Sequence, residues 1–401
     1  MRLVLYTGNG GVGKTTTAAA TAACAASRGR RTLVASADAA HSLGDVLECR
    51  LAPEPIAVAP RLEALEVDAR TEMARHWGRI RDWLVALLRY QGIEEVVAEE
   101  LALLPGAEEL TTLLAVDAHA RSGRYDLVVV DCAPTDSALR LLTLPDVASR
   151  SLRALLRLQQ AVAAVATPLA RMLVAAPLPG PGVFADADRL LYRRLRGLRR
   201  LLAGPGTSTR LVVTPERMVI DEARRAFTDL ALFQLPVDAV VMNRLLPHAA
   251  IREDFFRDWG RLQEERRREV EELFAPLPVL PAPLQEDEVT GLAKLREHGE
   301  LLFEAREPDA ILCRMAGLRF AREGDAWRVD LPLPGAERTE LDVSKRDDEL
   351  LVRAGERRQA IRLPRRLAAA ELGRAKLAGG VLAVWLHEAP EAELREIDGC
   401  G

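Results

Sequence analysis

Glycines are concentrated near the amino end of the chain, directly after an apolar segment. Residues 2–7 predict a buried strand, and Gly8-Asn-Gly-Gly-Val-Gly-Lys-Thr15 follows them, ahead of an alanine-rich segment. The spacing from Gly8 to the final Gly-Lys-Thr is that of a phosphate-binding loop. In such a loop, successive backbone N–H groups turn toward a polyphosphate, and the next helix presents its positive amino end to the same anion. This stretch restricts the fold more than any other part of the sequence.

The residue types that follow the glycines indicate which ligand is bound. A lysine at position 14 can reach the β- and γ-phosphates, and the hydroxyl of the next residue can ligate Mg²⁺. We therefore predict a site for ATP and Mg²⁺. Its nucleotide-binding residues are Gly8, Gly10, Gly11, Val12, Gly13, Lys14, Thr15 and Thr16.

A dinucleotide site is the alternative, because Gly8-x-Gly10-x-x-Gly13 also matches the NAD fingerprint and Asp38 follows the next predicted strand. Two features favour a triphosphate. Lys14-Thr15 directly follows the last glycine, and the segment 127–131 predicts a strand that ends in an acid, as Mg²⁺ coordination requires. An NAD-dependent oxidoreductase remains the less favoured hypothesis.

Strand and helix patterns alternate through the first three quarters of the chain. This alternation predicts an α/β fold, a doubly wound and mostly parallel sheet of the P-loop NTPase type. Helical insertions are expected at about 69–124 and 148–203, and a charged helix at 251–275. The remaining segments are a helix at 16–28 and strands at 32–36, 127–131, 209–216, 239–244 and 278–281.

The pattern changes after residue 304. Short alternating segments separated by turn residues, with no helix between them, predict a small all-β sandwich. We expect an ATPase domain at 1–305, a linker at 306–316, the sandwich at 317–387 and a tail at 388–401.

Composition limits the partners and the compartment. The formal net charge of −4 argues against a nucleic-acid partner held by bulk positive charge. The five cysteines are far apart and form no C-x-x-C motif, which fits a reducing, cytoplasmic location. We expect no signal peptide, since a predicted strand starts at residue 2, and no membrane-spanning segment.

Six groups of residues act as motifs along the first three quarters of the chain: Gly8–Thr16, Ser36–Asp45, Leu104–Glu109, Asp131–Thr135 with Leu139–Pro145, Thr214–Glu216 and Pro236–Arg244. With these motifs, residues 1 to about 305 resemble the ArsA family of ATPases, in the deviant phosphate-loop group. Residues 317–387 resemble the small heat-shock (α-crystallin-like) domain, which is appended in bacterial members of that family.

The resemblance implies roles for single residues. Asp38 would orient or activate the attacking water, with Lys14 as the second catalytic residue. Asp131 would support Mg²⁺ together with Thr15, and Asn243 would bind adenine. Pro134, just after the acid, makes a stiff turn that is suited to sensing the γ-phosphate. In this family two nucleotide domains close on ATP, so a homodimer is expected.

The sequence also departs from the family pattern. Asn9 stands where the family has a signature lysine that reaches the partner's phosphates, which predicts slow turnover. Residues 136–138 differ from the usual second switch, and the cysteine clusters for metalloid and for zinc are missing. The prediction is an ATPase that couples hydrolysis to dimer opening and closing and to partner handling. One alternative is a nucleotide-gated chaperone or scaffold with very weak ATPase activity, and a third hypothesis is an arsenite-efflux ATPase. The sequence does not identify the protein client or membrane partner.

Overall fold

Residues 1–36, 42–67, 107–131 and 194–387, with a few residues between 78 and 95, are described by a computed structural model. An eight-stranded sheet has the order β3-β4-β2-β5-β1-β6-β7-β8, and β3 alone runs antiparallel to its neighbour. The strands are β1 (Arg2–Thr7), β2 (Thr32–Ser36), β3 (Ile56–Ala59), β4 (Leu62–Glu66), β5 (Leu127–Asp131), β6 (Thr207–Val213), β7 (Val237–Leu245) and β8 (Val279–Pro283). The predicted doubly wound sheet is confirmed.

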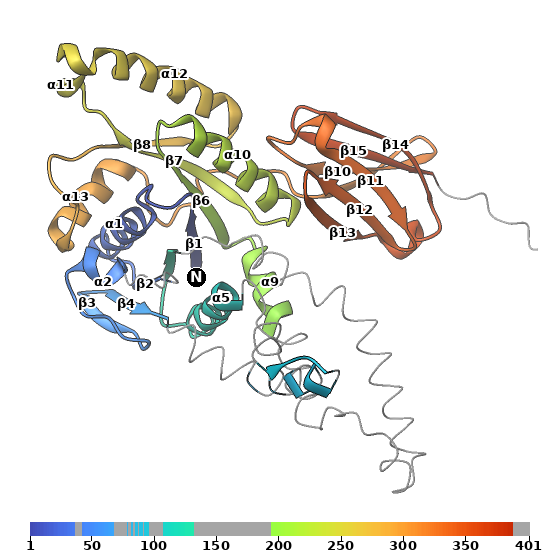
Figure 1. Cartoon of the computed structure of the whole chain (residues 1–401), viewed down its shortest axis with the longest axis horizontal. Helices are drawn as coiled ribbons and strands as arrows, with labels where there is room; N and C mark the ends of the chain where they lie inside the picture. The colour runs from blue at the N-terminus through green and yellow to red at the C-terminus, as the bar shows by residue number, and fades with distance from the viewer. Residues whose placement is uncertain are drawn as a thin grey trace, which may run out of the picture.

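Helices cover both sides of this sheet (Figure 1). One group lies together on one side: α1 (Lys14–Ser27), α2 (Ser42–Leu47) and α13 (Gly291–Phe303). The opposite side carries α5 (Ala107–Ala120), α9 (Arg196–Leu202) and α10 (Arg217–Leu232). Right-handed crossovers produce this division, because the chain moves one way across the sheet from β1 to β2 and β4, and the other way from β4 to β5, β6, β7 and β8.

Small side chains explain the packing of α1. Ten consecutive residues, 17–26, are buried, because α1 lies between α13 on one side and the strands β1, β2 and β5 on the other. A Cβ added to Gly299 of α13 would lie 2.5 Å from the Ala20 carbonyl oxygen. The backbones of the two helices are therefore too close at this point for any residue but glycine. The alanine-rich composition of α1 therefore serves helix–helix contact in the core.

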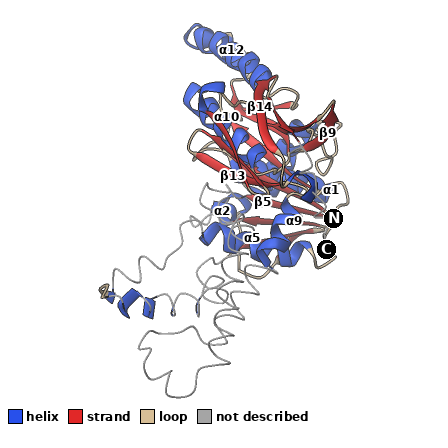
Figure 2. Ribbon diagram, turned by 90° about the vertical axis from the view of Figure 1, so that its right-hand side faces the viewer, coloured by secondary structure: helices blue, strands red, loops and turns tan. Residues whose placement is uncertain are grey.

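The charged helix predicted at 251–275 begins later than expected. Glu253 has an extended backbone (φ −69°, ψ 137°), which separates α11 (His248–Ile251) from the 3₁₀ turn η2 (Asp254–Phe256) and α12 (Arg257–Leu273). Charge patterning does not reveal such a break. As Figure 2 shows, α12 projects away from the sheet, and only Gly260 and Val270 in it are buried.

The carboxyl-terminal strands form two antiparallel sheets, with orders β14-β15-β10-β9 and β11-β12-β13. Their inward side chains, among them Val329, Leu350 and Val384, share one core, which confirms the predicted all-β sandwich. The strands are β9 (Arg319–Glu323), β10 (Ala326–Pro332), β11 (Leu341–Arg346), β12 (Glu349–Ala354), β13 (Arg357–Arg362), β14 (Glu371–Ala378) and β15 (Val381–His387), and the 3₁₀ turns are η3 (Arg338–Glu340) and η4 (Arg365–Leu367).

The helical insertions are only partly described. Within 69–124, α5 is helical, and within 148–203, α9 is helical. The rest of these insertions and the tail lie largely or wholly outside the described residues. In the described part of the chain, no helix combines the length and the apolar character needed to cross a bilayer.

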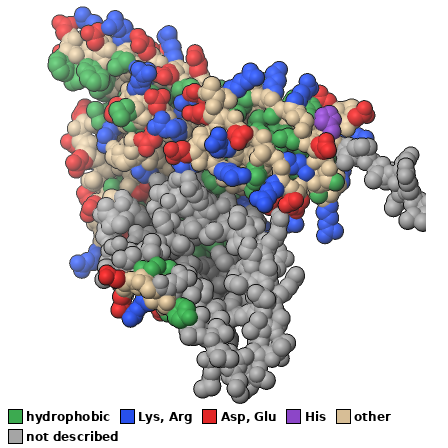
Figure 3. All heavy atoms as spheres, turned by 45° about the vertical axis from the view of Figure 1, so that its right-hand side comes forward, with side chains coloured by type: hydrophobic (Ala, Val, Ile, Leu, Met, Phe, Trp, Pro, Cys, Tyr) green, Lys and Arg blue, Asp and Glu red, His purple; other side chains and the backbone are tan. Residues whose placement is uncertain are grey.

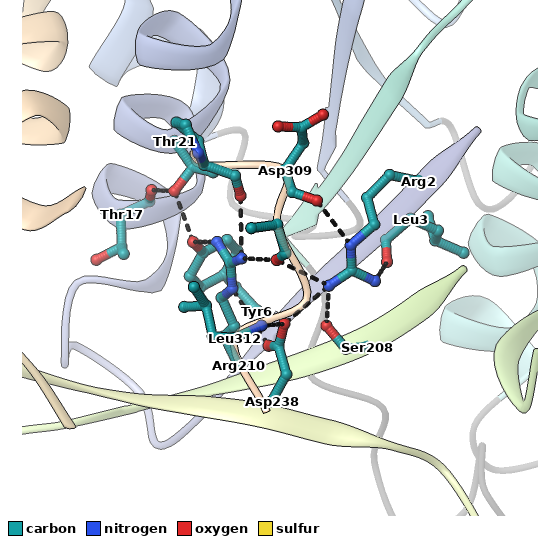
Figure 4. Close-up of polar contacts among 12 residues, drawn as sticks. Arg2, Leu3, Tyr6, Thr17, Thr21, Ser208, Arg210, Asp238, Asp309 and Leu312 are labelled. Atoms are coloured by element: carbon teal, nitrogen blue, oxygen red, sulfur yellow. Dashed lines mark hydrogen bonds and ion pairs between the residues drawn. The ribbon is translucent and has the colours of Figure 1, made fainter. Parts of the chain in front are cut away.

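A buried ionic cluster holds the segment between α13 and the sandwich against the sheet (Figure 4). Asp238 accepts from Arg2 at 2.8 Å and from Arg210 at 3.3 Å. The two guanidinium groups also donate to the carbonyl oxygens of Pro308, Asp309 and Ala310. Burial lowers the pKa of Arg2 to about 10, so the group stays charged at neutral pH.

We predict that Asp238→Ala lowers the free energy of unfolding by about 3–5 kcal/mol, because two buried cations lose their shared counter-charge. Asp258→Ala is the control, since it removes an exposed ion pair with Arg261 and should cost less than ~1 kcal/mol. Urea denaturation followed by circular dichroism measures both. Equal midpoints for the two variants would contradict a structural role for the cluster.

Candidate functional site

The phosphate-binding loop, residues 8–15, leaves the carboxyl end of β1 and enters α1. Gly11 and Gly13 have φ of +73° and +93°, a region that disfavours L side chains. A Cβ added to Gly8 would lie 2.3 Å from the Val212 carbonyl oxygen on β6, and one added to Gly13 would lie 2.3 Å from Asn243 Nδ2 on β7. Gly10 and Gly11 have open space around them. Glycine is thus required by both sterics and backbone at Gly8, whose φ is +151°, and at Gly13.

The amino end of α1 suits an anion. Gly13 is its N-cap, and among the described residues no side chain hydrogen bonds to its first turn as a cap. The first hydrogen bond within the helix runs from Thr17 N to Gly13 O, at 3.0 Å. Backbone N–H groups of the first turn and the positive end of the helix dipole are therefore available to a phosphate. Val12 is buried, whereas Thr16 in the first turn is half-buried.

The side chain of Lys14 folds back over the loop. Its Nζ donates to the Asn9 carbonyl oxygen at 2.8 Å. Asn9 is held in turn by its side chain, since Nδ2 donates to Glu222 Oε2 on α10 at 2.6 Å and Oδ1 accepts from Gly10 N at 2.6 Å. The contact with Glu222 was not predicted, because 213 positions separate the two residues.

Two predicted magnesium ligands come from neighbouring elements. Thr15 lies in the first turn of α1, with Oγ1 3.4 Å from Ser42 Oγ of α2. Asp131 ends β5, is 3% exposed and lies in register with Tyr6 of β1 and Ser36 of β2. A hydroxyl and a carboxylate at the carboxyl edge of the sheet fit Mg²⁺, which takes most of its ligands from phosphate and water. Within the described ranges, no group of three or more His, Cys, Asp or Glu could hold a metal by itself.

Asn243 contacts the loop directly. It is 8% exposed, and its Nδ2 donates to the Val12 carbonyl oxygen at 2.8 Å. The amide of Asn243 therefore braces the phosphate-binding loop against β7. Its predicted contact with adenine stays a prediction, as do the roles of Asp38 and Pro134, which lie outside the described residues.

The described cysteines do not form a soft-metal site. Three free thiols lie in separate parts of the chain: Cys24 in α1, Cys49 between α2 and β3, and Cys313 between α13 and β9. Burial raises the pKa of each, to about 12 for Cys24, so all three stay protonated at neutral pH.

Comparison with known families divides the chain as the fold does. The family described as "Anion-transporting ATPase" matches residues 1–304, and the "HSP20-like domain found in ArsA" matches residues 324–386. Both expectations from the sequence motifs are confirmed.

Curated relatives agree along nearly the whole chain. The putative arsenical pump-driving ATPase 1 of Aquifex aeolicus is 34% identical over 390 residues, which cover 94% of this chain and 98% of the relative. The putative arsenical pump-driving ATPase of Chlorobaculum tepidum is also 34% identical, over 96% of this chain and 95% of the relative. An ATPase ASNA1 homolog of Paramecium tetraurelia is 24% identical over 76% of this chain. With a loop shaped for polyphosphate and these matches, the chain belongs to the ArsA family of anion-transporting ATPases.

Proposed function

We propose that this protein is a Mg²⁺-dependent ATPase that hydrolyses ATP to ADP and phosphate at the phosphate-binding loop. The observation that carries the proposal is the close contact of Gly8 with β6 and of Gly13 with Asn243 of β7, which fixes the loop at the amino end of α1, where no side chain of the described residues caps the first turn. Pre-oriented N–H groups stabilise the negative charge of a transferring phosphoryl group without reorganising during the reaction.

The residues then have separate tasks. Backbone N–H groups of the loop bind the phosphates, and Lys14 leaves the Asn9 carbonyl to neutralise phosphate charge. Thr15 and Asp131 would hold Mg²⁺, which when bound offsets the charge of the phosphate oxygens. Asp38 would orient the attacking water, Pro134 would sense the γ-phosphate and Asn243 would contact adenine while bracing the loop.

We also propose a homodimer that closes over the carboxyl edge of the sheet. Met218, Phe255 and Trp259 are 82%, 78% and 57% exposed, and all three follow the carboxyl ends of β6 or β7, the edge that carries the loop. Figure 3 shows hydrophobic side chains at the α11–α12 end of the molecule. Large apolar side chains exposed beside a binding site favour a protein interface there.

A nucleotide-gated chaperone or scaffold with weak turnover is the second candidate. It is favoured by Asn9, whose amide is shorter than lysine, uncharged and bonded to Glu222 of its own chain. In this form ATP would control the dimer while hydrolysis stays slow. Suppression of aggregation of a model client, measured with and without ATP, distinguishes this function from efficient ATPase catalysis.

We predict that Lys14→Ala lowers the rate of phosphate release by about 10²–10³-fold, because a cation aligned with the phosphates is lost. Lys376→Ala is the matched control, since Lys376 is exposed on β14 in the sandwich. A coupled phosphate assay with ATP and MgCl₂ gives both rates. Equal rates in wild type and both variants would remove the enzymatic claim.

We predict that Gly13→Ala weakens ATP binding by at least about tenfold, because the new Cβ meets Asn243 and displaces the loop. Gly123→Ala is the control: this residue also has a positive φ, +72°, but nothing lies within 4 Å of its added Cβ. Isothermal titration with ATPγS measures the two affinities. Unchanged affinity in Gly13→Ala would show that the nucleotide binds elsewhere.

We predict that Trp259→Arg weakens ATP-dependent dimerisation by about tenfold, because a charge replaces an exposed apolar contact. Sedimentation velocity with and without ATPγS measures the dimer fraction. Arg261→Ala, on the same helix, should leave it unchanged. A dimer fraction insensitive to Trp259→Arg would place the interface on another surface.

A further inference from the structure

One helix contacts both the phosphate-binding loop and the carboxyl-terminal sandwich. On the loop side, Glu222 of α10 accepts the hydrogen bond from the Asn9 side chain. On the sandwich side, Arg224 donates to Gly335 O at 3.1 Å and pairs with Glu337 at 2.7 Å. These contacts lie two residues apart on the same helix.

The next turn of α10 makes further contacts with the sandwich. Thr228 Oγ1 donates to the Pro334 carbonyl oxygen at 2.8 Å, and Asp229 pairs with Arg357 at 3.0 Å. Leu232, the last residue of α10, is buried in the core of the sandwich. A Cβ on Gly335 would lie 2.9 Å from Arg224 Cγ, so the turn at 333–337 packs directly on the helix.

The helix between these contacts is suited to transmit a displacement. Ile220, Ala223 and Phe227 are buried on its inner face, and α10 packs on β6 and β7. From Glu222 to Asp229 the helix rises only about 10 Å. A movement of the Glu222 turn therefore moves the turns that hold the sandwich.

Polyphosphate binding disturbs the loop side of this arrangement. The exposed carboxylate of Glu222 hydrogen bonds to a loop residue and repels an anion held by that loop. Lys14 must also leave the carbonyl oxygen of Asn9 to reach a phosphate. Both effects weaken the contact between Asn9 and Glu222.

We propose that α10 couples nucleotide binding to attachment of the sandwich, with the Asn9–Glu222 contact as the point where the phosphate is sensed. The coupling rests on the proposed ATP site. ATP loosens the contact of α10 with the turn at 333–337, and attachment of the sandwich opposes ATP binding by the same factor, since coupling between two sites is reciprocal.

The test combines ATPγS affinity with hydrogen exchange of the full chain. In wild type, saturating ATPγS with MgCl₂ should raise amide exchange at 333–337 at least about threefold. Glu222→Ala should tighten ATPγS binding about fivefold, the size expected for removing one hydrogen bond and one repulsive charge, and should abolish the exchange response. The double variant Asp229→Asn/Glu337→Gln, which breaks both ion pairs with the sandwich, should tighten binding similarly.

Asp221→Ala is the matched control. Asp221 is the adjacent acid on α10, and its carboxylate is 4.0 Å from Arg217. It should leave both readouts unchanged, whereas an equal gain in affinity from Asp221→Ala and Glu222→Ala would reduce the effect to general electrostatics and overturn the proposal. Wild type that binds ATPγS with no exchange response would overturn the coupling alone. Wild type that binds no ATPγS would overturn the proposed function as well.

Discussion

The structure depends on a steric constraint: the phosphate-binding loop touches the sheet at two points that have no room for a side chain. Gly8 lies against the backbone of β6 and Gly13 against Asn243 of β7. These contacts link β1 and α1 to strands more than 190 residues later in the chain. The loop is therefore shaped by the sheet and by α1 together, and this pre-organisation makes its backbone a binding site.

Positive groups at the two edges of the sheet differ in whether the protein itself neutralises them. At the amino edge, Asp238 and backbone carbonyls neutralise Arg2 and Arg210 inside the protein, and the segment that leads to the sandwich is fastened there. At the carboxyl edge, Lys14 donates to a loop carbonyl and no side chain of the described residues caps the first turn of α1, so a phosphate can take both places. The contrast separates a structural ionic site from one suited to an exchangeable anion.

Local patterns were enough for much of the fold. The strands at 32–36 and 127–131 were predicted with the observed bounds, because both are short, wholly buried and rich in β-formers. The edge strand β3, which has only 4 residues, and its neighbour β4, in which Glu63 and Glu66 interrupt the apolar residues, were not predicted. The charged pattern at 251–275 predicts a single helix, since composition does not show that an extended residue, Glu253, interrupts it.

The sequence by itself determined the fold class, the phosphate-binding loop and the family, because each is written in residues that are close together or in segments with a clear period. Tertiary structure alone decided what Asn9, Asn243 and Glu222 contact. Their side chains can donate or accept in many settings, and their partners lie more than 200 positions away. The same holds for the attachment of the sandwich to α10. No local pattern predicts it, because the contact forms between α10 and the turn at 333–337 only after both have folded.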